Sequence, residues 1–179
     1  MSISKTLVVL LLGGIFSEMT WSLAQQSSTG VLTMQDYDDI RQLYGKYAFA
    51  IDSANPEAFA GTLARDDGSV SFYQGAGHDA MMTLINTNVA GEIRRGILRR
   101  HLNTNLLITP TKEGADAACY LLAINVGVSP PAIISASQYQ DKLVKTPEGW
   151  RFKRRVVTTD GPPAGAFAVQ AEAERSSKR

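Results

Sequence analysis

The sequence predicts an α+β domain in which three N-terminal helices pack in a curled antiparallel sheet, forming a cone with an open pocket. Two observations support this fold class. Helical periodicity and helix-start signals occur before Ala90, whereas alternating runs separated by turn residues fill the chain from Arg99 to Thr159. The chain has 179 residues, of which 44% are hydrophobic. This is enough apolar material for one domain with a substantial core.

Residues 1–24 are expected to be a secretory signal peptide. Lys5 provides a basic start, Leu7–Phe16 are apolar, and small residues precede the expected cleavage after Ala24. An uncleaved membrane anchor is the alternative, but the apolar run is too short to span a bilayer comfortably. The expected location is therefore secreted or periplasmic, with no stable membrane insertion after the signal is removed.

The rest of the chain divides into a flexible leader (25–34), the folded domain (35–160) and a flexible tail (161–179). Apolar residues at helical spacing predict a first helix that begins near Gln35 and ends at Asp52. Asn55 and Pro56 are typical of a helix start, so a second helix follows and ends before Gly68. A third helix is predicted over residues 78–89.

The strands are predicted from alternation and from the turn residues between them. A short strand should occupy residues 69–73. Four longer strands are expected at Arg99–Thr109, Ala117–Val128, Ile133–Lys145 and Trp150–Thr159. Because short turns join the long strands, the sheet should be an antiparallel meander.

Composition excludes several classes of function. Lys+Arg number 18 and Asp+Glu number 17, so the net charge argues against a nucleic-acid or anionic-membrane partner. The single cysteine, Cys119, cannot form an intramolecular disulfide and is expected to be buried. Two histidines without a cysteine cluster offer no metal-ligand spacing, and no phosphate loop or nucleophile elbow is present. We therefore expect neither a metal nor a cofactor.

Asp52 and His101 are the candidate catalytic residues. A carboxylate in the last turn of a helix faces the negative end of the helix dipole, and Asn55 already caps the next helix. Helical phase places Asp52 at the edge of the apolar stripe, and His101 opens an alternating strand. An acid/base pair is one hypothesis. The alternatives are a structural hydrogen-bonded pair, or side chains that face solvent.

Alternation along the strand that begins at Arg99 predicts which of its side chains share a face with His101. It places His101, Asn103, Asn105 and Leu107 on one face, with Leu102, Thr104, Leu106 and Ile108 on the other. Asn103, Tyr44 and Tyr47 are candidate contacts to a substrate oxygen, although aromatic residues at helical spacing are also typical of core. His78 is expected to be exposed. The basic clusters Arg94-Arg95, Arg99-Arg100 and Arg151/Lys153-Arg154-Arg155 are interpreted as solvated surface.

Three blocks, YAFAIDSANPEAFAGTLARDDG, RRHLNTNLLI and YQDKLVKTPEGWRFKRR, resemble the SnoaL-like family of the nuclear-transport-factor-2-like superfamily. The resemblance runs from about Tyr37 to Val157 and implies the cone fold. In scytalone dehydratase-like and dehydrochlorinase-like members, an Asp at the end of the first helix orients a strand His that moves the proton. Asp52 and His101 match these two positions. Ile51 departs from the scytalone dehydratase-like pattern, which has Tyr there.

The resemblance is less specific for the reaction than for the fold, because the superfamily contains lyases, isomerases, cyclases and non-enzymatic binding proteins. It implies a cofactor-independent lyase or isomerase that acts on a small hydrophobic organic substrate. The alternative is a non-catalytic ligand-binding or interaction protein of the same fold. The resemblance also implies a homodimer, which the sequence itself does not determine.

Overall fold

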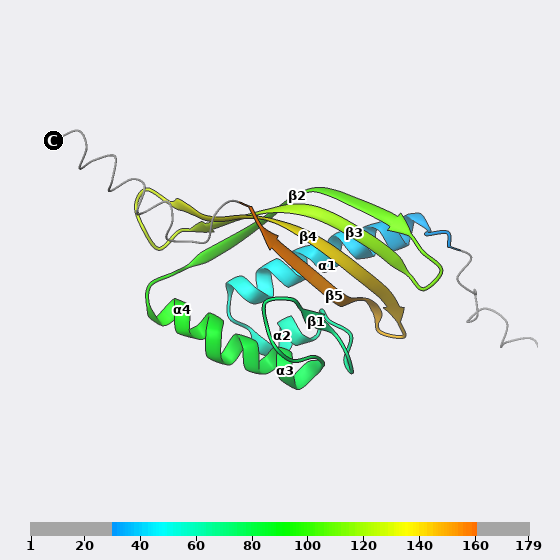
Figure 1. Cartoon of the computed structure of the whole chain (residues 1–179), viewed down its shortest axis with the longest axis horizontal. Coiled ribbons are helices and arrows are strands. Elements are labelled where there is room, and N and C mark those ends of the chain that lie inside the picture. Colours follow the sequence, from blue (N-terminus) through cyan, green and yellow to red (C-terminus); the bar gives the residue numbers. More distant parts are fainter. Residues whose placement is uncertain (1–29, 161–179) are drawn as a thin grey trace, which may run out of the picture.

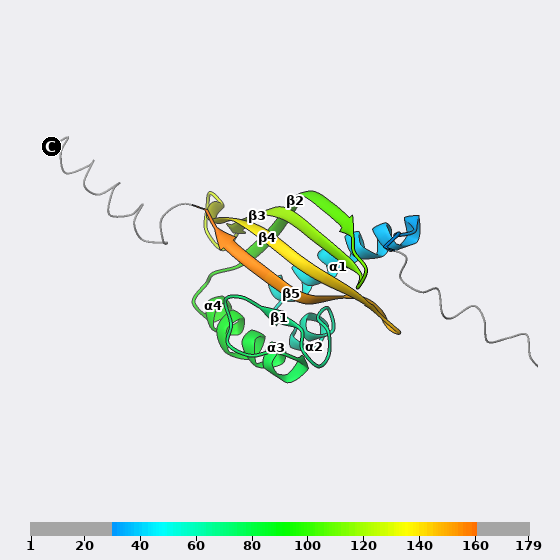
Figure 2. The same ribbon diagram turned by 45° about the vertical axis from the view of Figure 1, so that its right-hand side comes forward.

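Five strands form one curled, unclosed sheet, and the helices lie against its inner side (Figures 1 and 2). The computed structural model describes residues 30–160; the expected signal peptide, residues 25–29 of the expected leader and the tail 161–179 lie outside this range. The elements in chain order are α1 (Met34–Asp52), α2 (Pro56–Ala60), β1 (Ser69–Val70), α3 (His78–Leu84), the π-helical turn η1 (Ile85–Val89), α4 (Ala90–Arg94), β2 (Arg99–Pro110), β3 (Ala115–Asn125), β4 (Ala132–Thr146) and β5 (Gly149–Thr159). The predicted α+β class is confirmed.

The helices begin where the sequence predicts, but the second ends earlier than expected, at Ala60 rather than near Gly68, and the third ends later. Asn55 caps α2 by accepting a hydrogen bond from the Ala58 N–H, with Pro56 at the first helical position. The third helix continues from α3 through η1 into α4, so it ends at Arg94 rather than at Val89. Among residues 30–160, no helix has the length and apolarity needed to cross a bilayer.

Helix α1 is held to the sheet by an acidic residue at each end. At its start, Thr33 and Asp36 form a capping box. The Asp36 Oδ1 atom also accepts hydrogen bonds from Lys145 Nζ (2.7 Å) and Trp150 Nε1 (2.9 Å), which tie the helix to the β4–β5 hairpin. At its other end, Asp52 reaches β2.

The sheet order is β1-β5-β4-β3-β2, and the four long strands are antiparallel as predicted. The short strand β1 pairs with β5 in parallel, with Ser69 opposite Arg154, so the complete sheet is mixed. The segment before β1 already runs alongside β5, where the Phe152 N–H donates a hydrogen bond to the Thr62 carbonyl at 3.0 Å. The chain continues in the same direction into β1, which therefore pairs with β5 in parallel.

A bulge at Asn105 divides β2 into two halves of opposite phase. Thr104 pairs with Tyr120 but Leu107 pairs with Ala118, so one extra residue is accommodated between them. Asn105 has a φ of 56°, in the left-handed region that Asn tolerates better than most residues. The expected alternation is therefore wrong beyond Thr104: Leu106 packs on the core, whereas Leu107 is 69% exposed.

The core lies between α1, α2, α3 and the inner face of β3, β4 and β5. Its largest fully buried apolar side chains are Tyr47, Phe59, Phe152, Ile40, Met81, Leu84 and Ile85. Full burial of one such side chain stabilises the fold by roughly 1.5–3 kcal/mol. Trp150 and Phe152 of β5 also face inward and are buried.

Candidate functional site

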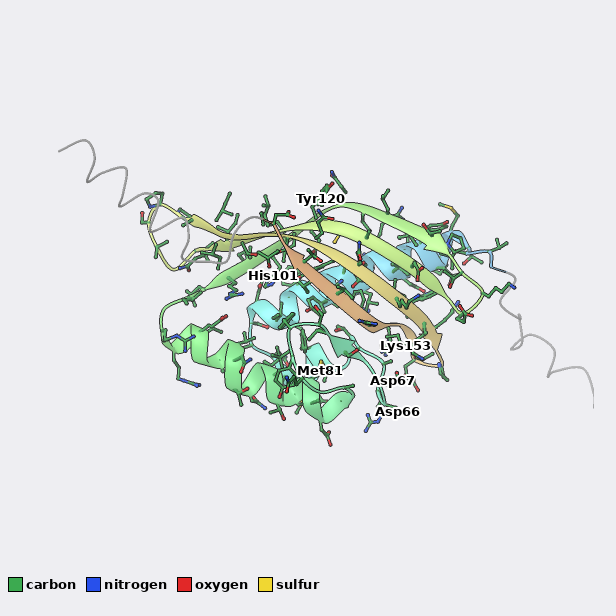
Figure 3. The ribbon with its side chains drawn as sticks, in the orientation of Figure 1. Asp66, Asp67, Met81, His101, Tyr120 and Lys153 are labelled. Atoms are coloured by element: carbon green, nitrogen blue, oxygen red, sulfur yellow. The ribbon has the colours of Figure 1, made fainter. Side chains whose placement is uncertain are left out.

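The structure brings the two predicted catalytic residues together. Asp52 is the last residue of α1 and His101 lies near the start of β2, on the side of the sheet that faces the helices (Figure 3). The Asp52 Oδ1 atom lies 2.5 Å from His101 Nδ1, and Oδ2 accepts a hydrogen bond from the His101 backbone N–H at 2.9 Å. The carboxylate therefore holds both the ring and the backbone of His101.

This two-point contact selects one tautomer of the imidazole. Because Nδ1 faces a carboxylate oxygen, Nδ1 carries the proton, and the neutral ring has its lone pair on Nε2. Within residues 30–160, no hydrogen bond is formed to Nε2. The side chains of His101 and Asp52 are 5% and 10% exposed. A largely buried, oriented imidazole with one free nitrogen has the arrangement expected of a general base.

Asn103 shares the inner face with His101, one pleat further along β2. The Cys119 Sγ atom lies 3.9 Å from Asn103 Oδ1, a weak contact that leaves the amide NH₂ without a partner among the described residues. Across the sheet, His101 is opposite Ala123, and Ala123 is opposite Ser135. The sheet beside the imidazole therefore carries small side chains.

On the other side of His101, Arg99 projects from the same face and pairs with Glu92 of α4, with Nη2 and Oε1 2.6 Å apart. Its Nε atom is buried and unpaired within the described chain. This pair links the helical layer to the end of β2 that bears His101. The other histidine, His78, is not exposed as expected: its side chain is 19% exposed and contacts Glu57 and Asp79.

A second buried ion pair, which the sequence interpretation missed, lies deeper in the cone. Arg155 is fully buried and donates from Nε and Nη2 to the two carboxylate oxygens of Asp141, at 2.8 and 2.7 Å. A register shift between β4 and β5 inserts Lys153, so Arg155 rather than Arg154 faces inward after Phe152. The expectation that this basic cluster is solvated is therefore wrong for Arg155. The inward position of Asp141 between Tyr139 and Leu143 was the available signal, since a buried carboxylate requires a partner.

Aromatic rings enclose the guanidinium. Arg155 Cζ lies 4.0 to 4.9 Å from four ring centroids, those of Tyr44, Tyr47, Tyr139 and Phe152. Burial alone would lower the pKa of Arg155, but the charge and hydrogen bonds of Asp141 outweigh it and raise this pKa well above its ordinary value. The cluster is a charged centre that is fully removed from solvent.

Tyr44 and Tyr47 belong to this second centre. The Tyr44 hydroxyl donates a hydrogen bond to Asp141 Oδ2, and burial together with the Asp141 charge raises the Tyr44 pKa. The Tyr47 ring packs on Arg155, while its buried hydroxyl has no hydrogen-bond partner among residues 30–160. Asp52 follows Tyr44 by eight positions in α1, which is about 12 Å along the helix axis. The role of Tyr44 and Tyr47 in substrate binding stays a prediction.

Three open grooves on the described surface are large enough to hold a small molecule, and neither Asp52 nor His101 lines any of these three. Two of them, of about 490 and 470 Å³, lie along β2, β3 and β4 and are lined by outward residues such as Leu107 and Gln140. The third, of about 800 Å³, lies between α1, α2 and the β4–β5 turn. In residues 30–160, no group of three His, Cys, Asp or Glu side chains is placed to hold a metal ion.

The described domain matches a known protein family over nearly its whole length. The profile of the SnoaL-like domain matches residues 32–156, which is most of the described chain. The chain belongs to the SnoaL-like family. The predicted resemblance is thereby confirmed, and the SnoaL-like match includes Asp52, His101 and Arg155.

Solved structures show the same fold at low sequence identity. A putative scytalone dehydratase from Novosphingobium aromaticivorans is 25% identical, with a TM-score of 0.58 over 71% of this chain and 85% of that one. ActVI-ORFA from Streptomyces coelicolor is 20% identical, with a TM-score of 0.63 over 72% and 98%. A protein from Catenulispora acidiphila, solved in complex with S-DNPA, is 24% identical, with a TM-score of 0.59 over 69% and 92%. None of the proteins with curated functions matches this SnoaL-like chain.

Proposed function

We propose that this SnoaL-like protein is a cofactor-independent lyase or isomerase that acts on a small hydrophobic organic substrate. The observation that carries the proposal is the two-point contact of Asp52 with the ring and backbone of His101. It orients the imidazole and leaves Nε2 as the free base. The SnoaL-like match and the likeness to a putative scytalone dehydratase support a reaction of this class.

The proposed chemistry is proton transfer at carbon. Nε2 of His101 accepts a proton from a carbon next to a carbonyl group, and Asp52 stabilises the imidazolium that forms. The electron pair of the broken C–H bond then expels a leaving group from the neighbouring carbon, or the imidazolium returns the proton to another carbon. Positioned acid/base catalysis of this kind contributes roughly 10²–10⁴-fold in rate.

Asn103 is the proposed contact to the substrate oxygen. It lies on the same face as His101, and its NH₂ group has no partner among the described residues. Tyr47 has an unpaired hydroxyl within the described chain, and Tyr44 donates a hydrogen bond to Asp141 and could only accept one from a substrate. Both are buried in the enclosed Arg155 cluster, so we propose them as substrate contacts only for a substrate whose binding opens this part of the core.

The test measures turnover of a panel of hydroxy-ketones and activated ketones by the wild type, by His101→Ala and by Asp52→Asn. We expect both variants to lose at least about tenfold in rate, and His101→Ala to lose more. His78→Ala is the matched control, because it removes the other histidine without touching Asp52. Equal rates in wild type and His101→Ala, or no turnover by either, would count against the proposal.

A second candidate function is ligand binding without catalysis. Its support is geometric: His101 is largely buried, and the three grooves described above are not lined by the pair. Native mass spectrometry of the purified protein, followed by a crystal structure of any co-purified species, distinguishes the two functions. A retained ligand that contacts His101 and is never converted would favour binding alone.

We also propose that the protein acts outside the cytoplasm, on the basis of the signal-like residues 1–24. N-terminal sequencing of the exported protein should begin at Gln25. A protein that keeps Met1, or that stays with the cytoplasmic fraction, would contradict this localisation.

A homodimer formed through the outer face of the sheet is the proposed assembly. Leu102, Leu107 and Tyr120 are 45, 69 and 51% exposed there, and Tyr120 projects away from the helices in Figure 3. Exposed apolar patches of this kind often mark interfaces. Sedimentation velocity should give a dimer that Leu107→Lys converts to a monomer; a wild-type monomer would contradict the proposal.

A further inference from the structure

The connection between β3 and β4 forms an apolar hairpin tip at one end of the molecule. Residues 126–134 (VGVSPPAII) are all exposed, and from Ala117 to Gln140 the chain has no charged residue. The exposed fractions of Ile133, Val128 and Val126 are 64, 46 and 38%. A projecting loop without charge is unusual on a surface in contact only with water.

A cluster of arginines lies beside this tip. Arg94, Arg95 and Arg100 are exposed, and none of them forms an ion pair with another residue of the described range. The nearby acid Glu92 is already paired with Arg99, and Asp160 is hydrogen-bonded to Gln138 on the β4 side of the hairpin. The local charge at this end is therefore positive, so the nearly neutral net charge, which argues against an anionic-membrane partner for the whole chain, does not exclude one at this end.

The two features are fixed to each other through Asn125. Its Oδ1 atom accepts hydrogen bonds from the N–H groups of Leu98 (3.0 Å) and Gly127 (2.9 Å), and the Val126 N–H donates to the Leu98 carbonyl at 2.8 Å. A side chain on Gly127 would meet the Gly96 carbonyl at 2.3 Å, so the two loops are in close contact. Figures 1 and 2 both show the β3–β4 hairpin beside the segment that joins α4 to β2.

From this arrangement we propose that this end of the protein docks reversibly on an anionic lipid surface. The apolar tip (Leu98, Val126, Val128, Ile133 and Ile134) enters the interfacial layer, and Arg94, Arg95 and Arg100 contact the acidic headgroups. An apolar insertion combined with neighbouring cations is the combination that gives peripheral membrane binding, since neither part suffices alone. This docking needs no membrane-spanning helix.

Docking would also orient the candidate site. Arg99 and Arg100 immediately precede His101, so the end of β2 that bears the imidazole would be the end nearest the bilayer. A hydrophobic substrate that partitions into lipid would then have a short path to the site. This last point rests on the proposed function, whereas the docking itself does not.

The test measures binding of the chain from Gln25 to Arg179, which contains every described residue, to lipid vesicles. One vesicle preparation is phosphatidylcholine alone and the other contains equal parts phosphatidylcholine and phosphatidylglycerol. We expect cosedimentation with the anionic vesicles only, weakened by added salt. Replacing Arg94, Arg95 and Arg100 by Gln should lower the affinity at least about tenfold. The matched control replaces three exposed basic residues elsewhere, Lys46, Lys112 and Arg154, and should change the affinity much less.

A fluorescence measurement tests the insertion of the tip directly. Ile133→Trp should give a blue-shifted emission when anionic vesicles are added, whereas Leu107→Trp on the outer sheet face should not. Equal binding to both vesicle types, or no binding to either, would overturn the proposal. So would a solution dimer that Ile133→Ser together with Ile134→Ser separates, because the tip would then belong to an interface with a second copy. None of these results depends on enzymatic turnover.

Discussion

The Asp52–His101 and Asp141–Arg155 pairs both join a buried carboxylate to a nitrogen base, yet their surroundings differ. Asp141 and Arg155 are opposite each other on neighbouring strands, are fully buried, and are enclosed by four aromatic rings. Asp52 and His101 join a helix end to a strand, keep some exposure, and face small side chains. In the first pair, both carboxylate oxygens are committed to the guanidinium. In the second, the imidazole keeps one free nitrogen.

This difference separates a structural role from a chemical one. A fully enclosed ion pair has no atom that a substrate can reach without dismantling the core, and breaking it leaves an uncompensated buried charge. A pair near the surface with one open nitrogen costs less to disturb and can exchange a proton. Disrupting the Asp141–Arg155 pair should therefore cost more stability, whereas disrupting the Asp52–His101 pair should cost more activity.

The largest expected effect on stability is at Arg155. Arg155→Met should lower the free energy of unfolding by about 3–5 kcal/mol, because the Asp141 carboxylate is left buried without its partner. Urea denaturation measures this loss. The neighbouring exposed Arg154→Met should change stability by less than about 0.5 kcal/mol. The double variant Asp141→Leu with Arg155→Met should recover most of the loss; if Arg155→Met alone costs nothing, the pair has no structural role.

A third buried carboxylate, Asp36 at the start of α1, shows what burial with several hydrogen bonds does to a pKa. Burial alone would raise the Asp36 pKa, but the hydrogen bonds from Lys145, Thr33 and Trp150 outweigh burial and lower it. Because the folded-state pKa lies below that of the unfolded chain, about 3.9 for Asp, the stabilisation is present above that value. It is lost as the pH falls through the folded-state pKa.

Asp36→Asn should therefore lower the free energy of unfolding by about 1–3 kcal/mol at neutral pH. Thermal unfolding of both proteins across the acid range provides the measurement. Below about pH 4 the difference between them should shrink, because the wild type loses this contribution and the variant has none to lose. A difference that is constant with pH would show that the Asp36 charge is not the source.

Asp52→Asn should have a smaller effect on stability, about 1–2 kcal/mol, because the amide can still accept one of the two hydrogen bonds from His101. The same variant should lose most of the proposed activity. Parallel measurement of unfolding and turnover tests this split between the two pairs. If Asp52→Asn lost as much stability as Arg155→Met, the Asp52–His101 pair would have a mainly structural role.

The smallest expected effect concerns Cys119, which lies between the two pairs on β3. Burial raises the pKa of its thiol to about 11, the nearby Arg155 charge only partly opposing this. Alkylation by iodoacetamide at mild alkaline pH should therefore be slow in the folded protein and fast in urea. It should quicken in Arg155→Met, whose inner core is loosened. Rapid labelling of the folded wild type would show that the sheet opens locally without unfolding.

Much of this structure follows from local signals in the sequence. Asn55, Pro56 and the apolar stripe of α1 predict the helices, and the turn residues predict the meander, because these preferences act within a few residues. The meeting of Asp52 and His101 was predicted through the family resemblance. By contrast, the burial of Arg155 and the face of Leu107 depend on bulges in β5 and β2. A bulge shifts every later side chain to the other face, and strict alternation cannot anticipate it.

The Asn105 bulge makes β2 behave like two short strands whose inner and outer sides have been exchanged at the junction. In a complete substitution scan, tolerance to polar residues should alternate as far as Thr104 and then resume with inverted parity from Leu106. Deletion of Asn105 would leave the whole strand with one parity. The shortened strand would then turn both His101 and Ile108 inward by plain alternation, so the bulge itself is not needed to keep the imidazole and this apolar contact on the same face.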